Sequence, residues 1–474
     1  MFGNIKDKAG ITQVFFNMNP TSLFCFFLCL IAVTGDRVYV HPFALFAYNR
    51  SSCKDLENLI QEEKTFVPIF IKSQAIPAYE EQPKPEMQSL GVNGKQRLSY
   101  LKNLVYVLGV RFYGAVRETR KGENILLSPT SIYGSLVSFY LVASGQTAAD
   151  LQDFLGFISP SGDPDCTSKV DGRKVLSALR TIDDPLLTNT ADDLFFSKLS
   201  CLFSAPNVRL AESFVHDLAL AADAFYARAV DFTNPRQAVE QINTFVKAKV
   251  TSRSKNLLTD IDPTTTLLFT SEIHLEANVK KACQLKEPQE FWTDSSTKIL
   301  VPMMSVTGLF QYKRDARKHF SITTIPLTKN ALLVLVQPIN GNDLNTIESE
   351  ISLQSSDWLQ DLSPRQIKLS LPQLTLESTY DLQELLVNMN LSTLLGKEAD
   401  LSKISNANPT VGKVINKAFF KLNLVDEVED PSEQNEDVVP MEVTLNNPFL
   451  LAIYEENSKA MLFLGRVANP LNGV

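Results

Sequence analysis

An apolar run meets the start of a helix at Asn124-Ile125-Leu126-Leu127-Ser128-Pro129-Thr130-Ser131-Ile132. Ser128 is suited to cap a helix, and Pro129 suits the first turn, where its missing N–H has no partner to lose. We therefore predict a helix over residues 131–144. A second helix is predicted upstream, because apolar residues recur there every three or four positions and so share one face. These residues are Leu101, Leu104, Val105, Leu108 and Phe112.

Further along the chain the pattern becomes that of strands. Residues 331–336 form a continuous apolar run, which suits a strand buried on both faces. Two segments alternate apolar with polar residues, as half-buried strands do. They contain Ile367, Leu369 and Leu371 in one case, and Phe420, Leu422 and Leu424 in the other. Residues 449–454 and 461–467 flank a polar turn and predict a hairpin. Helices followed by strands indicate an α+β domain with large antiparallel sheets.

Composition and motifs argue against several classes of function. The 474-residue chain has a formal net charge of -8 and no long run of Lys and Arg, which argues against a nucleic-acid partner. Its histidines stand in no metal-binding spacing, and no G-x-S-x-G or P-loop occurs. They are His41, His216, His274 and His319. We therefore expect no enzymatic activity, no metal and no cofactor.

The longest apolar run lies near the N-terminus, over residues 23–33, and is too short to span a bilayer comfortably. Val33 and Gly35 stand where signal peptidase accepts small residues. We expect residues 1–35 to be a signal peptide cut between Gly35 and Asp36, so that the chain is secreted and does not insert into a membrane. A buried core helix is the alternative interpretation, and either Met1 or Met18 could be the start.

The rest of the chain divides into an expected tail, residues 36–96, and an expected globular domain, residues 97–474. Pro, Glu and Gln are frequent around residues 77–85, which favours turns and mobility over a packed core. Four cysteines remain after the signal segment: Cys53, Cys166, Cys201 and Cys283. Their full pairing has three connectivities, which the sequence alone leaves open.

The segment at 124–132 resembles the serpin pattern N-x-x-x-S-P-x-S-I. Other serpin-like segments follow in the order that the family has. They are Val301-Pro302-Met303-Met304, Thr379-Tyr380-Asp381-Leu382, Ala399-Asp400-Leu401-Ser402, Asn447-Pro448-Phe449 and Phe463-Leu464-Gly465-Arg466-Val467-Ala468-Asn469-Pro470. The resemblance covers about residues 101–470. It implies a serpin-like fold, with helices around three β-sheets and an exposed reactive loop, plus the N-terminal tail.

Inhibitory serpins trap proteases by inserting the reactive loop into the main sheet, which requires a hinge of small residues. The matching stretch here is Val425-Asp426-Glu427-Val428-Glu429-Asp430-Pro431-Ser432-Glu433. Its carboxylates would be costly to bury, and Pro431 would remove a hydrogen-bond donor from the sheet. We therefore predict a member that does not inhibit proteases. An inhibitor of serine proteases is the alternative function, and a carrier of a small hormone is a third.

The expected mature N-terminus also resembles a known family, that of the angiotensin peptides. It reads Asp36-Arg37-Val38-Tyr39-Val40-His41-Pro42-Phe43, and Ala44-Leu45 would complete a decapeptide. The resemblance implies three partners. Renin would cut between Leu45 and Phe46, and angiotensin-converting enzyme would then cut between Phe43 and Ala44. The octapeptide 36–43 would act on a G-protein-coupled receptor to raise blood pressure and regulate salt and fluid balance.

The residues of this segment also predict its conformation. Val38 and Val40 favour extended backbone, and Pro42 biases His41 away from helix. An aspartic protease takes up an extended chain by pairing with its backbone. We therefore expect the segment around Leu45 and Phe46 to be extended and accessible.

Two kinds of modification are predicted. Asn49-Arg50-Ser51 and Asn390-Leu391-Ser392 are glycosylation sequons, with Asn49 and Asn390 as the acceptors. The family resemblance implies a disulfide that ties Cys53 of the tail to a cysteine of the body, and we predict Cys166 as that partner. Cys201 and Cys283 are then expected to be single thiols.

Overall fold

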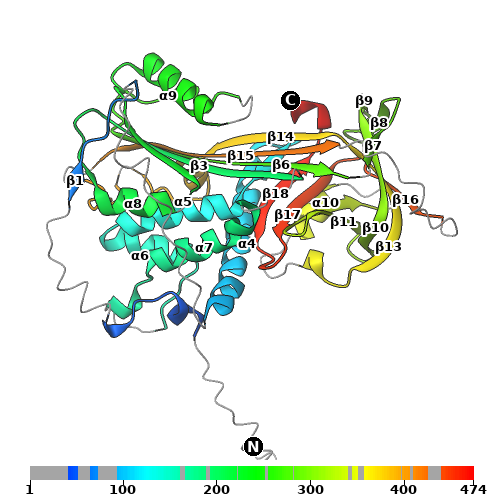
Figure 1. The fold of residues 1–474 in the computed structure, drawn as a ribbon, viewed down its shortest axis with the longest axis horizontal. Coiled ribbons are helices and arrows are strands. Elements are labelled where there is room, and N and C mark those ends of the chain that lie inside the picture. Colours follow the sequence, from blue (N-terminus) through cyan, green and yellow to red (C-terminus); the bar gives the residue numbers. More distant parts are fainter. Residues whose placement is uncertain are drawn as a thin grey trace, which may run out of the picture.

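In a computed structural model, most of the described helices lie in the first half of the chain and most of the described strands in the second (Figure 1). The structure describes residues 41–51, 64–72, 93–160, 166–187, 193–220, 222–250, 255–280, 282–339, 344–350, 357–396, 398–405, 409–424 and 439–473. Several expected features lie outside these residues. They are the signal peptide with its cut at Gly35 and Asp36, the peptide residues 36–40, Cys53, residues 77–85 and the hinge at 425–433.

Both predicted N-terminal helices are present. The upstream helix is α4 (Gly94–Thr119), and the other is α5 (Pro129–Val142). Ser128 caps α5 as expected, because its hydroxyl accepts a hydrogen bond from the Ser131 N–H at 3.3 Å. The remaining described α-helices are α6 (Gly145–Phe154), α7 (Gly172–Leu187), α8 (Glu212–Leu220), α9 (Pro235–Lys249), α10 (Leu344–Glu350) and α11 (Leu382–Asn388).

A five-stranded sheet separates α9 from α5 (Figure 1). Its strands, in spatial order, are β14 (Leu374–Asp381), β15 (Val411–Leu424), β6 (Leu267–Val279), β3 (Leu194–Ser204) and β5 (Ala224–Ala229). The Phe139 ring on α5 packs edge-on against Phe269 of β6, with ring centroids 5.7 Å apart. The parallel strands β15 and β6 are hydrogen-bonded directly to each other from Val411 to Leu424.

A nine-stranded sheet forms the other side of the core. Its order is β16 (Met441–Thr444), β13 (Ser363–Pro372), β10 (Met303–Asp315), β11 (Phe320–Thr328), β12 (Ala331–Pro338), β17 (Phe449–Glu455), β18 (Met461–Val467) and β2 (Ile125–Leu127), with β7 (Ala282–Gln284) also paired to β10. Two-stranded sheets join β8 (Gln289–Trp292) to β9 (Lys298–Val301), and β1 (Thr65–Phe66) to β4 (Leu210–Ala211). The α+β class and every predicted strand are confirmed. The described strands thus form two large and two small sheets, where three sheets were expected.

A buried group of charges crosses the five-stranded sheet. The Lys417 ammonium on β15 lies 2.8 Å from a carboxylate oxygen of Glu377 on β14 and 3.7 Å from one of Glu272 on β6. All three side chains are less than a tenth exposed. One cation therefore joins three adjacent strands.

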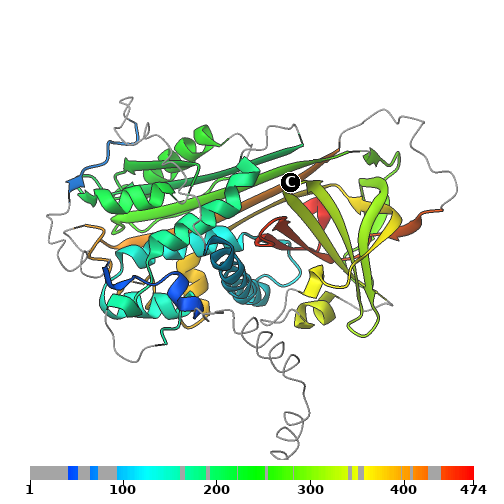
Figure 2. The same ribbon diagram turned by 60° about the horizontal axis from the view of Figure 1, so that its bottom comes forward.

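Parts of the expected tail pack against the body. Strand β1 pairs with β4, and Ile71 is buried in a hydrophobic cluster with Phe232 and Leu258. Residues 41–51 lie beside the N-terminal end of α4 (Figure 2). None of the helices in the described ranges is both long and apolar enough to cross a membrane.

Candidate functional site

The candidate site is the segment 41–51, which holds the end of the expected hormone and the bond between Leu45 and Phe46. Pro42–Leu45 forms one turn of 3-10 helix, η1. His41 stays extended, as predicted, with φ -56° and ψ 132°, and its Nδ1 accepts a hydrogen bond from the Phe43 N–H at 3.3 Å. The N–H groups of Phe46 and Ala47 both donate to the Phe43 carbonyl.

The expectation of an extended, accessible segment is therefore wrong for the described residues. Phe43, Leu45 and Phe46 are 2%, 5% and 0% exposed. Pro42 permits the turn, because its fixed φ suits the first position of a helix as well as an extended chain. Burial of three large apolar side chains within four residues outweighs the local preference for extension, at about 1.5–3 kcal/mol for each side chain.

Aromatic side chains of the body hold Phe46. Its ring lies 5.4 Å from that of Phe157 in an edge-on arrangement and 6.4 Å from that of Tyr100 on α4. Phe157 follows Gly156, whose positive φ of +88° turns the chain after α6. A side chain at position 156 would also meet Leu104 at 2.7 Å. Glycine there allows Phe157 to lie against Phe46.

Three successive backbone carbonyls at the expected cut, those of Leu45, Phe46 and Ala47, accept hydrogen bonds from the body. Arg97 Nε donates to the Leu45 carbonyl at 2.8 Å, so a cation lies on the scissile peptide group itself. The Asp171 N–H donates to the Phe46 carbonyl at 2.8 Å, and Lys174 Nζ donates to that of Ala47 at 2.9 Å. Ala47 also forms an antiparallel bridge with Val170, next to Asp171. These hydrogen bonds fasten the backbone from Leu45 to Ala47 to the body.

Tyr48 is the next residue of the segment, and its N–H donates to the Lys169 carbonyl of the body at 3.2 Å. Burial, and then the neighbouring Asp171 carboxylate, raise the pKa of Tyr48 to about 12. The phenol is therefore neutral at physiological pH. It adds no charge to the surface of the body on which segment 41–51 lies, which we call its seat. Arg173 beside it is held by Asp217, with its Nε 2.8 Å from a carboxylate oxygen.

The cysteines divide into bonded and free. Cys166 is disulfide-bonded, and it opens the short turn η2 (Cys166–Ser168) that leads to the bridge at Val170. Cys201 is a buried free thiol and Cys283 an exposed one. The expected partner, Cys53, lies outside the described residues. The pairing of Cys53 with Cys166 therefore stays a prediction.

Both sequons are at the surface. Asn49 is exposed three residues beyond Phe46, and its Oδ1 accepts a hydrogen bond from the Ser51 hydroxyl at 2.7 Å. Asn390 is exposed just after α11, with a positive φ of +60°. Neither position is blocked by packing, although occupancy stays a prediction.

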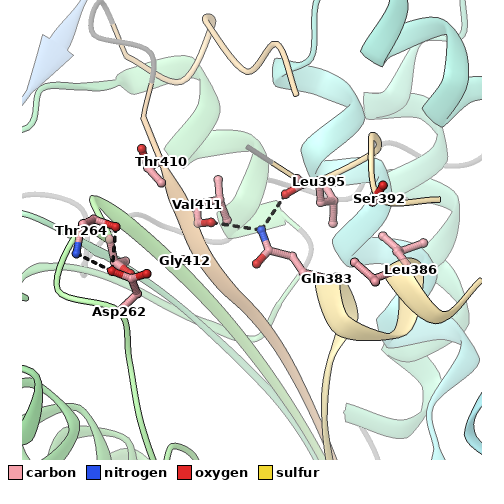
Figure 3. Close-up of a pocket in the computed structure, with 12 residues that line it drawn as sticks. Asp262, Thr264, Gln383, Leu386, Ser392, Leu395, Thr410, Val411 and Gly412 are labelled. Carbon is pink, nitrogen blue, oxygen red and sulfur yellow. Dashed lines mark hydrogen bonds between the residues drawn. The ribbon is translucent and has the colours of Figure 1, made fainter. Parts of the chain in front are cut away.

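A separate pocket of about 190 Å³ lies between α11 and the start of β15 (Figure 3). Gln383 lines the pocket, and its Nε2 joins two other lining residues by donating to the carbonyls of Leu395 and Val411 at 2.6 and 3.1 Å. Ser392 of the second sequon lines it, but no residue of the segment 41–51 does. Within the described ranges, no cluster of three or more His, Cys, Asp or Glu could hold a metal ion.

The sequence did not reveal the residues that hold the segment. They are Arg97, Tyr100, Phe157, Asp171 and Lys174. The spacing of Arg97, Tyr100, Leu101 and Leu104 on one helix face was the one available signal. It shows a shared face but not what that face contacts.

Comparison with known proteins gives similarities along nearly the whole chain. Residues 104–470 match the family model described as "Serpin (serine protease inhibitor)". Angiotensinogen of Bos taurus is 40% identical over 94% of this chain and 97% of its own length. Angiotensinogen of Rattus norvegicus is 38% identical over 96% of this chain and 100% of its own length.

Solved structures give the same fold. Uncleaved ovalbumin superposes with a TM-score of 0.67 at 22% identity, over 78% of this chain and 100% of its own. Human thyroxine-binding globulin gives 0.66 at 21% identity, over 79% and 99%. The serpin-like architecture expected from the motifs is confirmed by these likenesses.

Proposed function

Because the chain belongs to the serpin family, and within it to the angiotensinogens, we propose that it is a secreted hormone precursor. The hormone would come from the N-terminal tail, and the serpin body would carry it. The observation that supports this most directly is 38–40% identity to angiotensinogens over 94–96% of the chain. The family is one of protease inhibitors, so the expectation that the chain is not an enzyme agrees with it.

The proposed processing has two cuts. Renin would cleave between Leu45 and Phe46 and release the decapeptide 36–45. Angiotensin-converting enzyme would then remove Ala44 and Leu45. The resulting octapeptide 36–43 would act on its receptor to raise blood pressure and regulate salt and fluid balance. The resemblance of residues 36–43 to angiotensin peptides supports these steps.

Burial of the scissile bond adds a requirement to this scheme. A protease cleft must surround the chain, so segment 41–51 has to leave its seat before it can be cut. Exposing Phe43, Leu45 and Phe46 costs on the order of 5 kcal/mol, which leaves roughly one molecule in several thousand open at any time. The body would therefore set how fast the hormone is released.

Incubation of the secreted protein with renin of the same species is expected to give a product of the mass of residues 36–45. Mass spectrometry identifies both the peptide and the new N-terminus at Phe46. A Phe46→Pro variant is the control, because a proline after the cut cannot offer the N–H that the protease binds. An intact chain after prolonged incubation sinks the proposal. A stable covalent adduct with a serine protease would instead favour the inhibitory alternative.

Non-reducing peptide mapping of the secreted protein is expected to join the peptides that contain Cys53 and Cys166. Such a bridge would fasten the chain just beyond Ser51 to the turn that leads to Val170. Cys201 and Cys283 should both react with a thiol reagent after unfolding, since both are free. Recovery of Cys53 as a free thiol would contradict this pairing.

A further inference from the structure

The body contacts the residues that become the carboxyl end of the decapeptide after cleavage. The decapeptide 36–45 ends in Phe43, Ala44 and Leu45. The side chains of Phe43 and Leu45 are buried against the body, while that of Ala44 points to solvent. The Leu45 carbonyl faces Arg97 Nε at 2.8 Å. Arg97 is part of α4, so it remains with the body when the peptide leaves.

Hydrolysis changes the charge at this contact. Water adds to the Leu45 carbonyl carbon, the C–N bond to Phe46 breaks, the water oxygen stays with Leu45, and the Phe46 nitrogen takes up both protons of the water. Leu45 then ends in a carboxylate, and Phe46 begins with an ammonium group. Before the cut only the guanidinium donor is ionised, whereas after it the carboxylate acceptor is ionised as well, so the attraction between opposite charges adds to the hydrogen bond. The Arg97 contact therefore becomes stronger when the bond is cut.

We propose that the serpin body is a binding site for its own decapeptide product, which it holds by the carboxyl end. More generally, the site would take peptides that end in a large apolar residue, a small residue and a large apolar residue with a free α-carboxylate. The proposal rests on the proposed function only for the origin of the ligand. Phe46 remains part of the body after the cut, and its return to the rings of Tyr100 and Phe157 forms the neighbouring half of the site again.

The same geometry discriminates between the two hormone forms. The octapeptide 36–43 lacks Ala44 and Leu45, so its carboxylate lies two residues before the position that Arg97 reaches. It also leaves the Leu45 seat empty. The body should therefore retain the decapeptide and release the octapeptide. Once the second cut is made, the shortened peptide would not bind to the body again.

The test uses the cleaved chain after exhaustive dialysis, titrated with fluorescently labelled synthetic peptide 36–45. The free acid is expected to bind about tenfold or more tightly than the same peptide amidated at Leu45. The octapeptide should bind more weakly than the decapeptide by a similar factor. Equal affinity of acid and amide, or no binding of the acid at millimolar concentration, would overturn the proposal.

Two variants locate the effect. Arg97→Ala should abolish the difference between acid and amide. Lys174→Ala is the matched control, because Lys174 Nζ bonds the Ala47 carbonyl, which stays on the body after the cut. It should keep the difference intact. If both variants lose it equally, the selectivity does not come from Arg97.

Failure of this proposal can be told from failure of the proposed function. The mass spectrum shows first whether renin makes the cut between Leu45 and Phe46. If renin does not, the proposed function fails, and pepsin, a less selective aspartic protease, is used to make the same cut. The titration then decides the binding proposal alone.

Discussion

Replacement of Phe157 by alanine is expected to raise kcat/KM for renin cleavage of the bond between Leu45 and Phe46 about tenfold or more. Phe157 lies outside the substrate sequence, and its ring packs edge-on against Phe46 at 5.4 Å. Its removal takes away an aromatic pair and part of the apolar seat, so more molecules have segment 41–51 released. A protease that captures only the released form gains by the same factor.

A matched variant separates this local effect from general loss of stability. Phe139→Ala removes another buried aromatic ring, which pairs with Phe269 at 5.7 Å inside the body. Each of the two substitutions should lower the free energy of unfolding by about 3–5 kcal/mol, but Phe139→Ala removes no contact with segment 41–51. Phe157→Leu is a milder variant that keeps the seat filled, and its acceleration should be smaller.

Initial rates at substrate concentrations well below KM measure the effect, with a synthetic peptide of residues 36–48 as the upper limit. The peptide has no body to bind to, so its rate gives cleavage of a fully released segment. Equal acceleration by Phe157→Ala and Phe139→Ala would show that cleavage follows global unfolding. An unchanged rate in Phe157→Ala would show that release of the segment does not limit renin.

The framework of the fold could be predicted from the sequence because it depends on local patterns. The spacing of Leu101, Val105, Leu108 and Phe112 marks the buried face of α4, and all four are buried. Ser128 and Pro129 mark the start of α5, and the alternation at Ile367, Leu369 and Leu371 marks β13. Each signal lies within a few residues of the structure that it predicts.

The seat of the hormone segment could not be predicted, because it joins distant parts of the chain. Arg97 lies 52 positions beyond Leu45, and Phe157 and Lys174 lie further still. Local preference at Val38, Val40 and Pro42 indicated extension. Burial of Phe43, Leu45 and Phe46 against the body favours a turn instead, and no local pattern contains the shape of that surface.

Replacement of Lys417 by methionine is expected to lower the free energy of unfolding by about 3–5 kcal/mol at neutral pH. Lys417 is 1% exposed and supplies the positive charge for Glu272 and Glu377, which are also buried. Methionine fills a similar volume but leaves two carboxylates without a cation. The matched control is Lys413→Met, on the same strand. Its ion-pair partner Asp260 is largely exposed, so this pair should be worth less than about 1 kcal/mol.

The loss in Lys417→Met should shrink as the pH falls. Burial raises the pKa of Glu272 above its usual value even with Lys417 beside it, because the lysine only partly opposes desolvation. Without Lys417, the folded-state pKa of Glu272 rises further above its unfolded value. The folded variant then binds the proton more tightly than the unfolded chain does. Its free energy of unfolding therefore falls as the pH rises from the unfolded-state pKa of Glu272 to the folded-state pKa, and it recovers when the carboxyl is protonated at lower pH.

Urea unfolding of the wild type, Lys417→Met and Lys413→Met at neutral and mildly acidic pH measures this difference. Adding Glu272→Gln to Lys417→Met should restore part of the lost stability at neutral pH, because it removes one of the two stranded charges. A deficit that is the same at both pH values would mean that packing around Lys417, and not its charge, holds β14, β15 and β6 together. The pH dependence therefore separates the two ways in which this residue can join the three strands.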